Sequence, residues 1–194
     1  MNYGHLLAAA LLAAAPTRNA RDLAPAPAAP TVVSSPAEPA ATVNPAVGDS
    51  APDFMYQSRD YLWQHLRNLL EQGSVLLVFG ATDDALRTLE REREELLHCG
   101  VIPVAVVGAR ESDVWRIVRR NDLTYSLLSD PHAVIAGQYG ALDRAGRAPR
   151  PVWFVIDHAG RVRATGEGVS PGRDWTATAV TALGLSDVHE ASAH

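Results

Sequence analysis

Residues 74–81 read SVLLVFGA and are followed directly by Thr82, Asp83 and Asp84. The apolar run is rich in β-formers and has the length of a strand that is covered on both faces, so it predicts a central parallel strand. Threonine and aspartate are favoured helix N-caps, and leucines at helical spacing follow as far as Gly100, a residue typical of helix ends. The stretch therefore predicts a buried strand that leads straight into a helix.

The same alternation continues along the chain. Residues 101–108, VIPVAVVG, repeat the buried-strand pattern, and Pro103 is expected at the start of that strand or at an unpaired edge position. Later patterns predict a helix capped by Ser112 over 113–121, a helical piece over 131–139, a strand over 152–158, a hairpin turn at Asp157-x-x-Gly160 and a closing helix over 174–183. This order predicts an α/β fold, a thioredoxin-like three-layer sandwich whose central mixed sheet is flanked by helices.

The first quarter of the chain has a different composition. Residues 1–15 contain the apolar run LLAAALLAAA, which is too short to span a bilayer and fits a secretory signal, with an alanine-rich helix or an over-extended start as the alternative. Residues 16–46 are rich in alanine and proline and are expected to form a disordered linker. The folded domain is expected over 47–185, before a polar tail at 186–194. We therefore expect export to the periplasm or the extracellular space, or else a cytoplasmic protein.

Composition excludes several classes of function. The net charge of −5 gives no attraction for phosphate backbones, so nucleic acid is not an expected partner. The domain offers no stable membrane span. The single cysteine, Cys99, excludes an internal disulfide, a CxxC pair and a multi-thiolate metal site. The seven histidines show no metal-binding spacing, and no cofactor motif occurs, so we predict neither a metal nor a cofactor.

Three blocks of sequence resemble one known family. They are VGDSAPDF (47–54), LTYSLLSDPHAVIAGQYGA (123–141) and WFVIDHAGRVR (153–163). In this order and spacing they resemble the peroxiredoxins of the alkyl hydroperoxide reductase C/thiol-specific antioxidant family, in which the first block leads into a hairpin. The resemblance implies a thioredoxin-like fold and a peroxide-reducing, antioxidant oxidoreductase.

The chain departs from this family where the chemistry is expected. In peroxiredoxins the first central strand runs into a Pro-x-x-x-Thr-x-x-Cys loop whose cysteine attacks the peroxide, whereas residues 79–88 read FGATDDALRT. The attacking position falls at Thr88, or at Arg87 if the alignment gaps by one. Neither side chain is a stable anion with a soft atom that can carry the oxidised state. We therefore expect a homologue without peroxidase activity that acts as a binding or assembly module, with a protein partner or a second copy of the chain as the expected partner.

Cys99 allows an alternative function. It could serve as a displaced nucleophile or an intermolecular disulfide site, which would make the protein a thiol-dependent oxidoreductase that uses Cys99 or the thiols of a partner. It could equally be a small packing residue at a helix end. Its place in the last turn before Gly100 puts it at the negative end of the helix dipole, which disfavours the thiolate. The packing interpretation is therefore preferred.

Pro151 is expected to take a cis peptide bond, because its position resembles the cis-proline that faces the active site in thioredoxin-fold relatives. Together with the helix start it defines a predicted contact surface, and that prediction is tied to the cis bond. Four tryptophans, at positions 63, 115, 153 and 175, lie among apolar residues at core-like spacing. The residues of the predicted contact surface are Thr82, Asp83, Asp84, Arg87, Thr88, Arg150 and Pro151.

Overall fold

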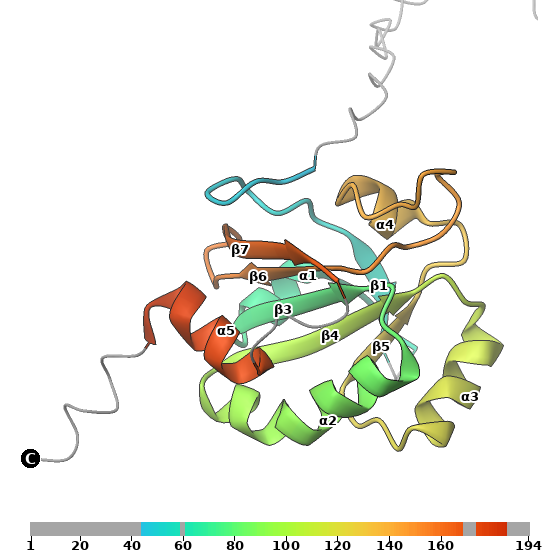
Figure 1. Cartoon of the computed structure of the whole chain (residues 1–194), viewed down its shortest axis with the longest axis horizontal. Coiled ribbons are helices and arrows are strands. Elements are labelled where there is room, and N and C mark those ends of the chain that lie inside the picture. The colour runs from blue at the N-terminus through green and yellow to red at the C-terminus, as the bar shows by residue number, and fades with distance from the viewer. Residues whose placement is uncertain (1–43, 59–60, 169–173, 186–194) are drawn as a thin grey trace, which may run out of the picture. The chain divides into compact units, whose positions relative to one another are not determined.

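A five-stranded mixed sheet forms the middle layer of the fold (Figure 1). The computed structural model describes residues 44–58, 61–168 and 174–185. Strands run in the order β5-β4-β3-β6-β7, with β3, β4 and β5 parallel and β6 and β7 antiparallel to their neighbours. The predicted mixed sheet is confirmed. Its strands are β3 (Ser74–Phe79), β4 (Val101–Val107), β5 (Ser126–Ser129), β6 (Val152–Ile156) and β7 (Val162–Glu167).

Helices cover both faces of this sheet. Alternate residues of β3 point to opposite faces, so that Leu76 packs in one buried cluster and Leu77 in the other. Leu86 of α2 and Trp175 of α5 share the cluster of Leu76, whereas Leu66 of α1 shares that of Leu77 with residues of α4. The predicted three layers are confirmed. The helices are α1 (Leu66–Leu70), α2 (Asp83–His98), α3 (Glu111–Arg120), α4 (Val134–Gln138) and α5 (Trp175–Leu183).

The ends of α2 match the sequence pattern. The Thr82 hydroxyl accepts a hydrogen bond from the Ala85 N–H at 3.3 Å, which satisfies one free donor of the first turn. At the other end Cys99 is the C-cap, and Gly100 follows with a φ of +71° that glycine adopts without strain.

The start of α3 differs from the prediction. The helix begins at Glu111 with Arg110 as its N-cap, so Ser112 lies inside the first turn. The helix begins earlier than predicted because the carbonyl of Arg110 already accepts hydrogen bonds from the N–H groups of Asp113 and Val114, at 2.8 and 3.0 Å.

The predicted turn between β6 and β7 is confirmed. The Gly160 N–H donates to the carbonyl of Asp157, and the Asp157 carboxylate accepts hydrogen bonds from the Arg161 N–H at 2.8 Å and from Arg163 Nε at 2.7 Å. Burial alone would raise the pKa of Asp157, but these hydrogen bonds and the charge of Arg163 outweigh it and lower the pKa below its ordinary value.

A separate two-stranded hairpin precedes the sheet. It joins β1 (Met55–Gln57) to β2 (Trp63–His65) in antiparallel register and lies near β5. The hairpin agrees with the one that the family resemblance implied. Ahead of it Pro45 is buried, two residues before the expected start of the domain at Val47.

Two further findings concern predictions about the whole chain. No helix in the described part is long and apolar enough to cross a bilayer. The signal at 1–15, the linker up to residue 43 and the tail at 186–194 lie outside the described residues, and export stays a prediction from the sequence.

Candidate functional site

The connection between β3 and α2 is short. Only Gly80, Ala81 and Thr82 separate the last residue of β3 from the first residue of α2. These three residues contain no cysteine. Arg87 and Thr88, the predicted attacking positions, instead lie in the second turn of α2. The positions at which the resemblance places the attacking cysteine are therefore helical in this chain.

The polar side chains at the start of α2 bond to one another and to α3. The Thr88 hydroxyl donates to the carbonyl of Asp84 at 2.9 Å, and Arg87 forms an ion pair with Asp84. Arg87 also donates through Nη1 to Oδ1 of Asn121 at 2.7 Å. Since Asn121 is buried and directly follows α3, this bond fixes the relative position of the two helices.

Asp83 completes this network. Its carboxylate accepts hydrogen bonds from Arg120 Nη2 at 2.8 Å and from Asn121 Nδ2 at 3.2 Å. Desolvation raises the pKa of Asp83, but the two hydrogen bonds and the charge of Arg120 lower it below its ordinary value. The structure thus brings together the five candidates of the predicted contact surface that lie at the start of α2, and it uses them for helix packing.

Arg150 and Pro151 belong to a different neighbourhood. Arg150 donates through Nη1 to Oε1 of Glu167 at 2.6 Å and through Nε to the carbonyl of Gly140 at 3.4 Å. Only the backbone of Arg150 comes close to the β3–α2 connection, where a Cβ on Gly80 would lie 2.6 Å from the Arg150 carbonyl carbon. In the described residues no hydrogen bond or ion pair joins the Arg150 side chain to α2.

The predicted cis bond at Pro151 is wrong, since the described residues contain no cis peptide bond. With the trans bond, the backbone on both sides of it is hydrogen-bonded. The Arg150 N–H donates to the carbonyl of Ala141 at 2.9 Å, and the Pro151 carbonyl accepts from the Gly168 N–H at 3.0 Å. Pro151 simply enters β6, where a proline costs no ladder bond. The predicted contact surface was tied to the cis bond, so we do not carry it into the proposed function.

Cys99 lies at the end of α2 that is remote from Thr82. A helix of sixteen residues is ~24 Å long, which separates this thiol from the β3–α2 connection. Cys99 is partly buried and packs against the cluster that contains Leu76, as the packing interpretation expects. Within the described part of the chain no group of three or more histidine, cysteine or acidic residues could hold a metal ion.

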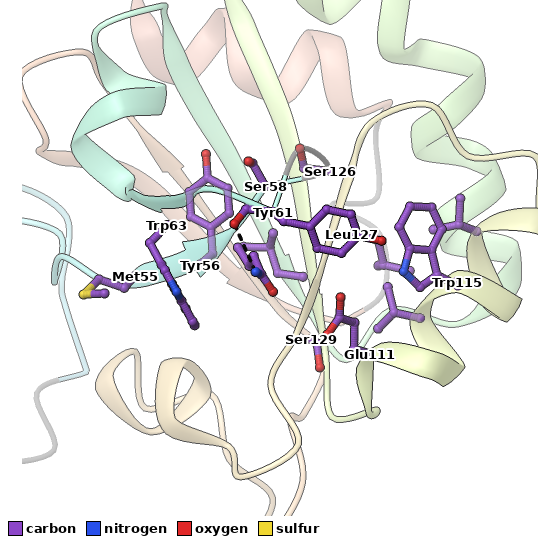
Figure 2. A pocket seen from close by; sticks show the side chains of 14 residues that line it. Met55, Tyr56, Ser58, Tyr61, Trp63, Glu111, Trp115, Ser126, Leu127 and Ser129 are labelled. Atoms are coloured by element: carbon purple, nitrogen blue, oxygen red, sulfur yellow. Dashed lines mark hydrogen bonds between the residues drawn. The ribbon is translucent and has the colours of Figure 1, made fainter. Parts of the chain in front are cut away.

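A groove between the β1–β2 hairpin, β5 and α3 resembles a ligand site. The β1–β2 hairpin, β5 and α3 enclose about 290 Å³, close to the lower limit of small-molecule sites (Figure 2). Its lining is mostly aromatic and aliphatic with a few polar groups. Its lining residues include Tyr56, Tyr61, Trp63, Trp115, Glu111 and Leu127.

Two of the four tryptophans line this groove instead of the core. Trp63 is 68% exposed and Trp115 is 40% exposed, so the core assignment is wrong for both, whereas Trp153 and Trp175 are buried as expected. Trp115 follows the inward-facing Val114 by one residue, which turns it ~100° away from the buried stripe of α3. Trp63 stands in a two-stranded hairpin that can bury only one of its faces.

The hairpin turn holds Tyr61 over the groove in an unusual conformation. Tyr61 has a φ of +61°, a left-handed value that costs a residue with a Cβ roughly 1–2 kcal/mol. Its N–H donates to the Ser58 carbonyl at 3.0 Å, and its own carbonyl accepts from Gln57 Nε2 at 3.1 Å. The side chain is nevertheless 65% exposed. Residues held in sparsely populated backbone conformations cluster at functional sites, including ligand clamps.

One carboxylate lies among the described residues that line the groove. It belongs to Glu111, from the first turn of α3, and none of the described lining residues is an arginine or a histidine. The other ionisable lining groups are the phenols of Tyr56 and Tyr61, and burial raises the pKa of Tyr56. Sequence reasoning missed this site. The signal was Tyr61-Leu62-Trp63, three consecutive large apolar residues, which cannot all point inward from a short hairpin.

Solved structures with the same architecture are peroxiredoxins. Peroxidoxin BcpB from Mycobacterium tuberculosis superposes with a TM-score of 0.60 at 21% identity, covering 72% of this chain and 95% of that one. Mycobacterium tuberculosis AhpC gives 0.61 at 15% identity, covering 74% and 94%. The reduced 2-Cys peroxiredoxin of Plasmodium vivax gives 0.60 at 18% identity, covering 75% and 84%. At these identities the likeness shows a shared fold.

Sequence comparison adds the family. No curated protein matches the chain. The model of the AhpC/TSA family matches residues 47–165, which is more than half of the 194 residues and includes all three blocks quoted above. This chain therefore belongs to the AhpC/TSA family.

Proposed function

We propose that this AhpC/TSA protein does not reduce peroxides and instead works as a binding module. The observation that carries the proposal is the segment from the end of β3 to the second turn of α2, residues 79–88, which holds no cysteine. A peroxidatic residue must attack as a stable anion and carry the oxidised state on a soft atom. Thr82, Arg87 and Thr88 offer neither property, and their side chains are engaged in helix capping and packing.

The groove between the hairpin, β5 and α3 supports the binding half of the proposal. Fold alone does not carry function, whereas a groove with exposed aromatic side chains points to binding. Five of the eight large hydrophobic side chains that are exposed in the described residues belong to the hairpin or to α3. A soluble protein rarely gathers such residues without a ligand or partner to cover them. They are Met55, Tyr61, Leu62, Trp63 and Trp115.

Peroxide consumption tests the catalytic half of the proposal. The full chain, reduced beforehand and supplied with a thiol reductant, is expected to consume hydrogen peroxide and an organic hydroperoxide no faster than its Cys99→Ser variant. Consumption that depends on Cys99 and turns over many times per protein would contradict the proposal. It would establish the alternative of a thiol-dependent oxidoreductase.

A further inference from the structure

The groove runs along an edge of the central sheet. β5 is the outermost strand on its side of that sheet, and β4 is the one described strand with which it pairs, because β1 and β2 form a sheet of their own. All four residues of β5 line the groove, and Figure 2 shows Ser126 and Ser129 between Trp63 on one side and Trp115 on the other. The floor of the groove is therefore the edge of a β-strand.

Backbone groups of β5 point into this groove. The Asp130 N–H donates to the carbonyl of Val107 at 2.9 Å, which fixes the residues whose backbone faces β4. Alternate residues of a strand bond to the same neighbour, so Leu128 faces β4, and the backbone groups of Leu127 and Ser129 face the edge. In the described part of the chain no other group bonds to the backbone of those two residues. The edge therefore offers their N–H and C=O groups to a further strand.

The walls of the groove come from opposite faces of the sheet. On one face, Val118 of α3 packs against the buried cluster that contains Leu76. On the other, Tyr56 of β1 belongs to the cluster that contains Leu77. The side chains of a strand added to β5 would alternate between these faces, so consecutive residues would contact α3 and the hairpin in turn. Because both walls are mainly apolar, both contacts favour apolar side chains.

The opposite edge of the sheet is protected, whereas this one is not. Residues 48–51 cover the start of β7, where the Gly48 N–H donates to the carbonyl of Val162 at 2.8 Å, and β7 also carries Arg163 and Glu167. β5 reads SLLS and has neither a charged residue nor a proline, which are common devices that keep an edge strand from pairing. Its length of four residues limits an added strand to a short segment.

We propose that the groove binds an extended segment of a partner protein, which adds to β5 as a further strand and is apolar over about the four residues that β5 spans. The inference rests on the proposed binding function and gives its ligand class. A second copy of the domain does not fit, because α3 and the hairpin flank β5 and would meet those of the other copy before the two edges could pair. The enclosed volume of about 290 Å³ likewise admits a few residues and no folded domain. This recognition uses main-chain groups and apolar contacts and does not depend on charge.

Calorimetric titration of the full chain with an uncharged peptide, Ac-Gly-Ser-Val-Leu-Val-Leu-Ser-Gly-NH2, tests the assignment. The control is the same peptide with N-methyl groups on two consecutive central residues. One of these two methyl groups replaces a donor to β5 in every register, because alternate N–H groups of a strand face its neighbour. We expect the unmethylated peptide to bind at least tenfold more tightly than the control. Equal affinities, or no binding of the unmethylated peptide at millimolar concentration, would overturn the proposal.

The peroxide assay separates this inference from the proposed function. Peroxide turnover that depends on Cys99 would overturn the proposed function whether or not the peptide binds. Failure of the peptide to bind, without such turnover, would overturn the strand addition alone.

Amide hydrogen exchange followed by NMR locates the added strand. We expect the N–H groups of Leu127 and Ser129 to exchange at least tenfold more slowly when the protein is saturated with the peptide. The Leu128 N–H, which the ladder to β4 already holds, is expected to change much less. If the peptide binds and the exchange of both Leu127 and Ser129 stays the same, the peptide lies elsewhere and the proposal is wrong.

Matched variants separate the edge from folding. Leu127→Pro removes an N–H at the edge without breaking a bond to β4, whereas Leu127→Ala shortens the side chain and keeps the N–H. We expect Leu127→Pro to bind the peptide at least tenfold more weakly than Leu127→Ala. Trp115→Ala shortens a wall and is expected to bind about tenfold more weakly than Leu97→Ala, which changes a similarly exposed side chain outside the groove. Equal affinities within either pair would contradict the proposal, and thermal melting shows that each variant is folded.

Discussion

Tyr61 holds a backbone conformation that any residue other than glycine adopts at a cost. Replacing it with glycine removes that cost together with the ring, whereas replacing it with alanine removes the ring and keeps the cost. We therefore expect Tyr61→Gly to have a free energy of unfolding ~1 kcal/mol higher than that of Tyr61→Ala. Urea denaturation of the two variants measures the difference.

Both variants lose the ring of Tyr61, and comparing Tyr61→Ala with the wild-type chain measures the stability that the ring contributes. If Tyr61→Ala were the more stable of the two variants, residue 61 would not hold a left-handed conformation in solution, and the argument from strain at the groove would fail.

Asp157 makes the stability of the folded protein depend on pH through the β6–β7 turn. Its pKa is lowered in the folded protein, so its stabilising effect is present above the ordinary value of ~3.9 and disappears as the pH falls through the lower, folded-state value. At pH 7 we expect Asp157→Asn to reduce the free energy of unfolding by about 1–3 kcal/mol, since two hydrogen bonds to a buried carboxylate weaken. Denaturation from pH 7 down to pH 3 measures the gap between the two proteins.

The difference in free energy of unfolding between the wild-type protein and Asp157→Asn is expected to narrow below pH ~4. A gap that stayed constant down to pH 3 would mean that the carboxylate contributes through its shape and not through its charge.

At the scale of elements, the β3–α2 connection depends on a close backbone approach. Gly80 has a φ of +59°, and a Cβ there would lie 2.6–2.8 Å from the backbone of Arg150 and Pro151. Gly100, at the other end of α2, has a φ of +71° but open space around it. Gly80→Ala is therefore expected to lower the free energy of unfolding by about 1–3 kcal/mol more than Gly100→Ala does. Thermal and urea unfolding of the pair measure the difference, and equal losses would show that β6 does not press against this connection.

The long elements could be predicted from the sequence, and the short ones could not. Residues 74–81 and the leucine stripe of α2 carry many apolar positions, so their periodicity is unambiguous. β5 has four residues and each strand of the β1–β2 hairpin has three, too few for a period of two to stand out from chance. The hairpin was expected only through the family resemblance, and β5 was not expected at all.

The candidate site was predicted poorly for the same physical reason. Thr82, Asp83 and Asp84 were correctly placed at the start of a helix. The sequence could not show that the partners of Asp83 come from the end of α3, because Arg120 and Asn121 lie more than thirty residues away. The groove is built from the elements with the weakest patterns. Trp63 and Trp115 therefore could not be distinguished from core residues by composition.

At the scale of the whole molecule, the domain is expected to fold without the first 43 residues. These residues show no apolar periodicity, whereas Pro45 is buried and Gly48 donates a hydrogen bond to Val162 at 2.8 Å. We expect the chain that begins at Asn44 to melt within a few degrees of the full chain, the shift that ~1 kcal/mol produces. Removing residues 44–48 as well should lower the melting temperature further. A large loss on the first truncation would show that the domain boundary is wrong.

The central claim is that this AhpC/TSA fold carries no peroxidatic thiol, although it contains one cysteine. Cys99 caps the far end of α2, at the negative end of the helix dipole, and packs against the core. Quenched-flow mass spectrometry of the reduced chain mixed with hydrogen peroxide measures its oxidation most directly. The expected result is that Cys99 becomes a sulfenic acid no faster than free cysteine does at the same pH. Oxidation a thousandfold faster than free cysteine would show an activated thiol and contradict the claim.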